Sequence, residues 1–166
     1  MKILSRTVLT YYLLVLLWLL LFKFSSHPLS VLSSYQTRSL NLIPFANTTL
    51  SNLHQIVYNI IALVPLGLLL GVNLKETKFW RKLIYIFALS VAVEITQYIF
   101  AIGRSDITDV IANTVGGLIG LLLYASVMKH VESEKLDRII VVVVAVLLIM
   151  FTLLRTLVFR FKYHSH

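Results

Sequence analysis

Long runs of apolar residues alternate with short polar connections along this chain. A run of about 20 residues can cross a bilayer as a helix. Five runs meet that length, at about 7–24, 54–73, 83–102, 110–128 and 139–158. The last contains "IIVVVVAVLLIM", whose β-branched residues would suit a buried strand in water, but in lipid only a helix satisfies its own backbone. The pattern predicts an all-α, polytopic membrane bundle of about five transmembrane helices.

Composition agrees with this architecture. Hydrophobic residues make up 58% of the chain and charged residues only 13%, against about a quarter in a soluble domain. We expect residues 1–166 to form a single membrane domain, whose first helix is retained because no small-x-small cleavage site follows it. The absence of cysteine excludes disulfides, thiol nucleophiles and cysteine-based metal sites.

The basic residues lie mainly at the ends of the apolar runs. The side that carries the N-terminus and the 74–82 and 129–138 connections holds nine Lys and Arg, and the opposite side holds six. The positive-inside rule therefore predicts a multi-pass protein of the bacterial cytoplasmic membrane, with a cytoplasmic N-terminus. Basic residues dispersed in this way favour contact with membrane lipids and do not favour nucleic-acid binding.

Two connections then face outward. One is the turn around "GRSD" at 103–106, and the other is the long segment 25–53. A connection of that length is often a functional cover. It contains "SLNLIPF", which is apolar enough to lie on the membrane surface. An ordinary interfacial segment is the alternative interpretation.

Polar side chains interrupt the third apolar run on one face. Ser90, Glu94 and Gln97 are spaced at i, i+4 and i+7. Glu94 precedes Ile102 by eight residues, which places it roughly 12 Å below the outer end of the helix. A carboxylate at that depth costs at least about 2.5–3.5 kcal/mol. We therefore expect Glu94 to face the bundle interior, pair with a partner or bind a proton.

The start of the fourth run has a similar stripe. Asp106, Asp109 and Asn113 share one helical face, and Arg104 precedes them. Asp106 can be the N-cap, and Asp109 falls in the first turn, where the helix dipole favours anions. Initiation of the helix alone would account for either aspartate, but it leaves Asn113 and Arg104 unexplained.

Features of the second and fourth runs predict how the helices meet. Pro65 is expected to kink the second helix and open space beside Asn59. Glycines four residues apart allow close helix approach. They are Gly67 with Gly71 and Gly116 with Gly120. We expect tight packing in the half of the bundle that contains them and a more open polar chamber in the other half.

Seven polar residues can therefore converge in the outer half of the membrane, and they are the candidate ligand-binding set: Asn59, Glu94, Gln97, Arg104, Asp106, Asp109 and Asn113. Their acidic excess could be relieved by a proton, by a divalent cation bound through oxygens, or by a cationic ligand group. A purely structural network bridged by Arg104 is the alternative. No HExxH, P-loop or Ser-His-Asp order is present, so we expect no resident metal or cofactor.

Four segments, in this order, resemble the VanZ-like family of membrane proteins. They are "NLIPF" at 41–45, "NIIALVPLGLLLG" at 59–71, "SVAVEITQ" at 90–97 and "GRSDITDVIANTVGGLIG" at 103–120. The resemblance covers a core of about 40–125. It implies a bacterial protein associated with resistance to glycopeptide antibiotics, above all teicoplanin. The family's polar positions correspond to Asn41, Pro44, Asn59, Pro65, Gly67, Glu94, Gln97, Arg104, Asp106, Asp109, Asn113 and Gly117.

Three functions remain open on the sequence. The first is binding, at the outer leaflet, of a lipid-linked envelope precursor or a lipoglycopeptide. The second is an enzyme acting on a lipid-linked or cell-wall substrate, with Glu94, Asp106 and Asp109 as acid, base or metal ligands and Arg104 holding a phosphate. The third is proton-coupled transport, for which five helices are few unless the protein forms a dimer.

Overall fold

The computed structural model describes residues 1–22, 38–46, 50–102 and 104–164, with side chains described outside 50–52 and 158–164. Five helices in these ranges are long and apolar enough to cross a membrane. They are α1 (Lys2–Leu21), α3 (Leu50–Asn73), α4 (Phe79–Phe100), α5 (Ile107–Val127) and α6 (Ser133–His164). The predicted all-α bundle is confirmed, and the β-branched run is helical. Each helix begins a few residues before its predicted run, because the first turn contains polar residues that an apolar run does not include.

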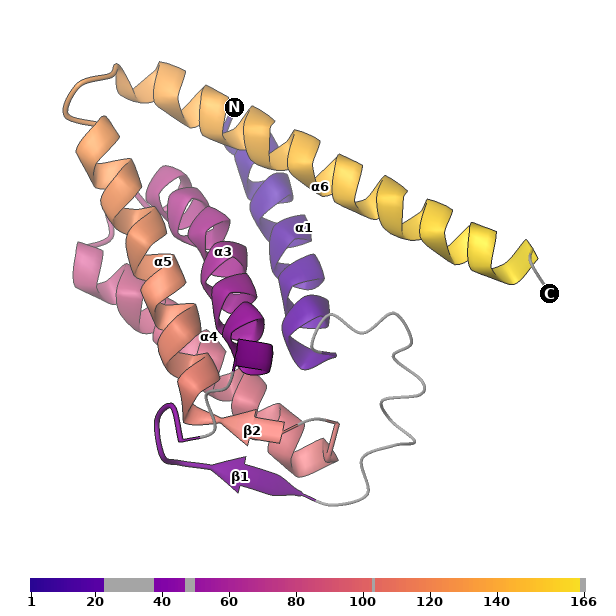
Figure 1. Cartoon of the computed structure of the whole chain (residues 1–166). Coiled ribbons are helices and arrows are strands. Elements are labelled where there is room, and N and C mark those ends of the chain that lie inside the picture. Colours follow the sequence, from indigo (N-terminus) through magenta and orange to yellow (C-terminus); the bar gives the residue numbers. More distant parts are fainter. Residues whose placement is uncertain (23–37, 47–49, 103, 165–166) are drawn as a thin grey trace.

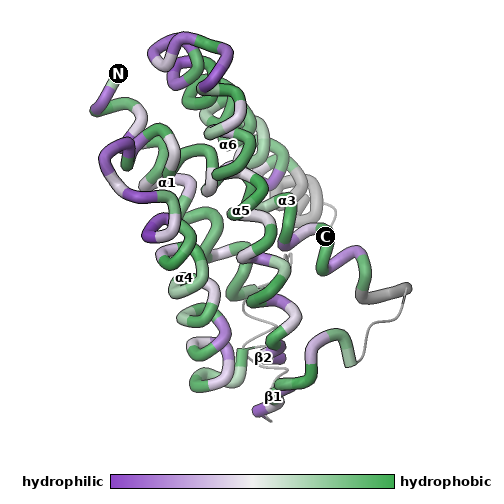
Figure 2. Tube along the Cα trace, turned by 90° about the vertical axis from the view of Figure 1, so that its left-hand side faces the viewer, coloured by the Kyte–Doolittle hydropathy of each residue, from purple (hydrophilic) through white to green (hydrophobic). Residues whose placement is uncertain are grey.

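The helix α3 occupies the centre of the bundle and contacts α1, α4, α5 and α6. Its most extensive contact is with α5. Figure 1 shows α1, α3 and α5 running alongside one another, while α6 crosses the end at which α1 begins and then leads away. Hydrophobic residues cover most of the helices, and hydrophilic residues gather at the connections at the two ends (Figure 2). The molecule therefore has two polar ends separated by an apolar belt.

Apolar side chains fill the space between the helices. One buried cluster includes Leu63, Leu66 and Ile86, and joins α1, α3, α4 and α5. A second cluster, which includes Leu69 and Val141, packs α6 against α1 and α3. Many other large apolar side chains are exposed on the outer faces of the helices, as expected for surfaces that contact lipid.

Glycines allow α3 and α5 to approach closely. A Cβ atom on Gly116 or Gly120 would overlap backbone carbonyl oxygens of α3, and one on Gly67 would overlap the backbone of α5. Gly71 lies against the ring of Tyr124. The close packing predicted from the two glycine pairs is therefore confirmed, and it fixes the relative positions of the two helices that carry the candidate site.

A short parallel strand pair lies at the end of the bundle opposite the N-terminus (Figure 1). The strand β1 (Ser39–Asn41) pairs with β2 (Arg104–Asp106), with Leu40 opposite Ser105. This pair is not predicted by the pattern of the sequence, because three-residue strands are too short to show alternation and the partners are far apart in the chain. Residues 25–37 and 47–49 of the predicted outward loop lie outside the described ranges.

Candidate functional site

A buried carboxylate joins α3 to α5. Asp109 lies in the first turn of α5, where sequence analysis placed it, and only 6% of it is exposed. Its Oδ1 accepts a 2.9 Å hydrogen bond from Nδ2 of Asn59, and its Oδ2 accepts one of 3.3 Å from Nε2 of Gln55. Gln55 is not among the residues predicted from the sequence. It precedes Asn59 by one helical turn on the same face of α3, and this spacing was the available signal.

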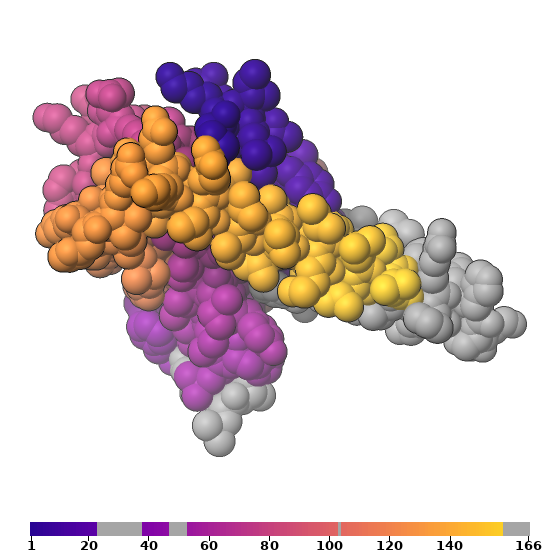
Figure 3. Space-filling model, turned by 90° about the horizontal axis from the view of Figure 1, so that it is seen from above, coloured from indigo at the N-terminus to yellow at the C-terminus, as the bar shows by residue number. Residues whose placement is uncertain are grey.

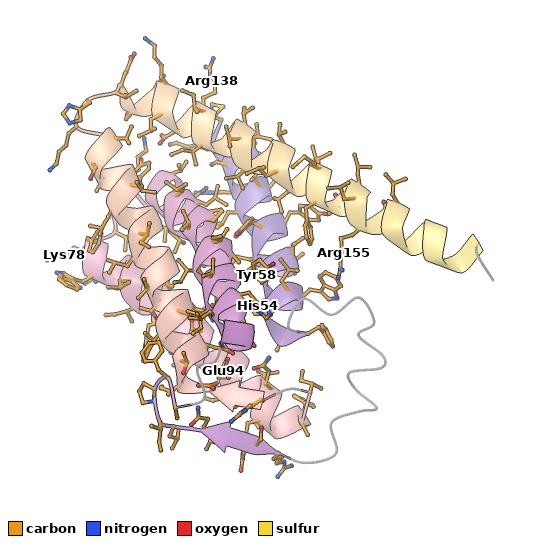
Figure 4. The ribbon with its side chains drawn as sticks, viewed as in Figure 1. His54, Tyr58, Lys78, Glu94, Arg138 and Arg155 are labelled. Atoms are coloured by element: carbon orange, nitrogen blue, oxygen red, sulfur yellow. The ribbon has the colours of Figure 1, made fainter. Side chains whose placement is uncertain are left out.

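A second buried carboxylate holds the strand pair against α4. Glu94 points from α4 toward the start of α5 and the strands (Figure 4). Its Oε2 accepts a 2.8 Å hydrogen bond from the backbone N–H of Asp106, and its backbone carbonyl accepts one of 3.1 Å from Oγ of Ser105. Glu94 is 7% exposed. The expectation that it turns toward the bundle interior and finds a partner is therefore confirmed.

Asp106 connects the start of α5 to the segment 38–46. It is the N-cap of α5, as predicted, and its Oδ1 accepts a 2.8 Å hydrogen bond from the backbone N–H of Thr108. Its Oδ2 accepts one of 3.0 Å from Nδ2 of Asn41. One carboxylate thus begins a helix and also holds β1 beside it.

The segment 38–46 is attached to α5 at a second point. The backbone N–H of Phe45 donates a 3.1 Å hydrogen bond to Oγ1 of Thr108. Phe45 has a φ of 59°, in the left-handed region that few non-glycine residues adopt. Its side chain is exposed, as are those of Leu40, Leu42 and Ile43. The segment therefore presents apolar side chains outward while its backbone is held at the helix start.

A small cavity separates the two buried carboxylates. Its volume is about 10 Å³, close to the least that holds one water molecule, so the prediction of a more open polar chamber in this half of the bundle is wrong. It is lined by Leu20, Gln55, Asn59, Val93, Glu94, Asp109 and Asn113. Asn113 is 1% exposed, and its Oδ1 has no hydrogen-bond partner within the described part of the chain. Two carboxylates and an unpartnered amide oxygen favour an occupant that donates hydrogen bonds or carries positive charge.

The remaining predicted site residues lie apart from this cavity. Nε2 of Gln97 donates to the backbone carbonyls of Leu20 and Leu21, at 3.0 and 3.2 Å, so Gln97 secures the last turn of α1. Arg104 is exposed on β2. The helix α3 runs unbroken through Pro65. Of the seven residues expected to converge, the structure brings Asn59, Glu94, Asp109 and Asn113 around one cavity and places Asp106 beside them.

His54 and Tyr58 lie in the first half of α3, at the end of the bundle that contains the cavity. The rings of His54 and Tyr58, both labelled in Figure 4, meet edge to face with centroids 5.8 Å apart. Both side chains are exposed. Across the described ranges, no three His, Asp or Glu side chains have the geometry of a metal site.

Comparison with known proteins places these observations in a family. A model of the family described as VanZ/LLP1 matches residues 9–129. Protein VanZ of Enterococcus faecium is 50% identical over 155 residues, which cover 93% of this chain and 94% of that protein. No solved structure matches the chain. The family model covers every residue that lines the cavity.

Proposed function

The chain belongs to the VanZ/LLP1 family, and we propose that it binds an amphiphile at the outer face of the bacterial cytoplasmic membrane. The amphiphile is an envelope lipid or a lipoglycopeptide, and binding contributes to resistance to glycopeptide antibiotics such as teicoplanin. The observation that carries the proposal is the junction of an exposed apolar segment with buried carboxylates. Phe45 is exposed in that segment, and its backbone N–H donates a hydrogen bond to Thr108, the residue that precedes Asp109.

This junction suits a ligand that has both an apolar and a polar part. Leu42 and Ile43 are each 68% exposed and can lie among acyl chains at the membrane surface. The cavity bordered by Glu94 and Asp109 lies behind them and favours a hydrogen-bond donor or a cationic group. A lipid tail would contact the segment while the polar group reaches toward the carboxylates.

The distribution of charge supports an outward position for this end. The opposite end carries most of the Lys and Arg in the connections, which the positive-inside rule assigns to the cytoplasm. Lipoglycopeptides and exported envelope precursors are present on the outer side. The proposed orientation therefore puts the carboxylates and the apolar segment on the side where such ligands occur.

Thermal stabilisation in detergent tests the binding. We expect teicoplanin, which carries an acyl tail, to raise the unfolding temperature of the purified chain more than a glycopeptide without a tail. Glu94→Gln keeps an oxygen for the Asp106 N–H but removes the charge, and should abolish the shift. Thr96→Val is the matched control, because Thr96 lies on the same helix and its hydroxyl donates to the carbonyl of Ala92, one turn earlier in that helix. Failure of every lipoglycopeptide and envelope lipid to stabilise the protein would contradict binding.

An enzyme is the second candidate, favoured by the water-sized cavity between Glu94 and Asp109. Either carboxylate would serve there as a general base toward a water, with Asp106 adjacent. Mass analysis of envelope lipids separates the two functions. Lipids that are unchanged by expression of the protein, together with loss of resistance in Glu94→Gln, support binding. A modified lipid that disappears in Glu94→Gln supports catalysis.

A further inference from the structure

The opposite end of the bundle contains a larger cavity, of about 530 Å³. It lies between the start of α1, the connection that follows α3, and the first turns of α6. Figure 3 looks onto this end and shows the indigo start of α1 next to the orange start of α6. Its volume falls within the range of about 300–1,000 Å³ typical of ligand pockets. Neither the carboxylates described above nor the strand pair contributes to it.

Charged side chains line this second cavity. The basic ones are Lys2, Arg6, Lys75 and Arg138, and the acidic ones are Glu76, Glu134 and Asp137. Asp137 is fully engaged within the protein, because its Oδ2 pairs with Nζ of Lys75 at 2.5 Å and its Oδ1 accepts a 3.0 Å hydrogen bond from the hydroxyl of Tyr124. Lys75 is engaged by the same pair, so Lys2, Arg6 and Arg138 remain beside Glu76 and Glu134, and basic side chains outnumber acidic ones by one.

The helix ends at this cavity also favour an anion. The helix α1 begins here without a side-chain cap, so its first backbone N–H groups are available. At the end of α3, the carbonyl of Leu69 accepts a 2.9 Å hydrogen bond from Nδ2 of Asn73, and that of Leu70 accepts one of 3.0 Å from the backbone N–H of Leu74. Oδ1 of Asn73 in turn accepts a 2.9 Å hydrogen bond from Oγ of Ser5. The start of α1 therefore adds backbone donors to the basic side chains that line the cavity.

A groove along α1 meets this cavity at Arg6. The groove measures about 420 Å³ and is lined by Ile3, Arg6, Thr7, Thr10, Tyr11 and Leu14. These residues follow the helix from its first turn into the apolar belt. Arg6 lines both spaces. A ligand whose charged group binds in the cavity can therefore place an attached apolar chain along the groove.

We propose that this end of the bundle binds an anionic phospholipid. The phosphate lies between Arg6 and Arg138, which come from different helices, and one acyl chain lies in the groove along α1. Val72 and Leu74 supply an apolar wall of the cavity beneath the headgroup. The site is separate from the proposed amphiphile site, and each can fail without the other.

Displacement of a fluorescent phosphatidylglycerol from the purified chain in detergent tests this proposal. We expect phosphatidylglycerol to compete strongly and phosphatidylcholine weakly. Arg6→Gln and Arg138→Gln should each weaken phosphatidylglycerol binding about fivefold, the effect of one basic residue near an anionic lipid. Lys78→Gln and Lys129→Gln remove the same charge from the same end without lining the cavity, and should leave the affinity unchanged.

Three outcomes overturn the proposal. Equal competition by phosphatidylcholine would remove the role of the anionic headgroup. Equal losses in the Lys78 and Lys129 variants would indicate general surface charge. Competition by inorganic phosphate as strong as that by phosphatidylglycerol would identify a soluble anion as the ligand and exclude the lipid. The unfolding temperature of each variant without lipid should equal that of the parent chain. A loss of affinity then reports weaker lipid binding and not a folding defect.

Discussion

Asn59 of α3 and Asp109 of α5 are joined by a 2.9 Å hydrogen bond, with 5% and 6% of the two residues exposed. Two turns along α5, a Cβ atom on Gly116 would overlap the carbonyl oxygen of Ile60, the residue next to Asn59. The polar bond and the glycine contact therefore belong to one continuous helix–helix interface. The close backbone approach keeps the amide within reach of the carboxylate.

Replacement of Asn59 by leucine should destabilise the protein. The substitution keeps the branched shape in a somewhat larger side chain and removes the hydrogen bond from Asn59 to Oδ1 of Asp109, and loss of a hydrogen bond to a buried polar group costs about 1–3 kcal/mol. Thermal unfolding in detergent should show a lower midpoint for Asn59→Leu than for the control Thr96→Val. An unchanged midpoint would mean that the bond contributes nothing to the α3–α5 interface.

Two neighbouring glycines of α5 should respond differently to alanine. A Cβ atom at Gly120 meets backbone atoms of α3, which can move only if the helices separate, whereas one at Gly117 meets only side-chain atoms of Ile86, which can shift without moving a helix. We expect Gly120→Ala to lose about 1–3 kcal/mol, the usual cost of overpacking, and Gly117→Ala to lose less. Thermal unfolding of the two variants provides the comparison, and equal losses would contradict the geometry.

Much of the architecture could be predicted because it depends on local sequence. Membrane spans follow from apolar length, and the N-cap role of Asp106 follows from its place before a periodic run. The inward direction of Glu94 follows from the cost of a charge in lipid. Each of these inferences needs only a few consecutive residues and one physical rule.

The remaining features depend on contacts that no local pattern encodes. Gln97 shares a helical face with Glu94, yet it donates to carbonyls at the end of α1 rather than toward the cavity. The pairing of β1 with β2 brings together residues 65 positions apart, as in the bond between Asn41 and Asp106. The partners of such side chains are the segments that pack against them, and that packing is determined by the bundle as a whole.

Asp106 should tolerate serine better than alanine. Serine can still accept the Thr108 N–H, whereas alanine leaves the first turn of α5 uncapped at a cost of about 0.5–2 kcal/mol. Both substitutions remove the carboxylate from Asn41. Unfolding temperatures should therefore rank parent, Asp106→Ser and Asp106→Ala in that order. If resistance to teicoplanin is lost equally in both, the carboxylate itself is needed for function.

The sidedness of the two ends can be tested in intact cells, because the chain has no cysteine of its own. Leu42→Cys lies on the exposed segment beside the strand pair, and Lys129→Cys lies at the other end between α5 and α6. We expect a membrane-impermeant maleimide to label Leu42→Cys in intact cells and Lys129→Cys only after the cells are opened. The expectation rests on the excess of basic residues at the N-terminal end, which favours the cytoplasm. The reverse labelling would place Glu94 and Asp109 near the cytoplasmic face, where an external antibiotic could not reach them, and would rule out the proposed binding of lipoglycopeptides at that site.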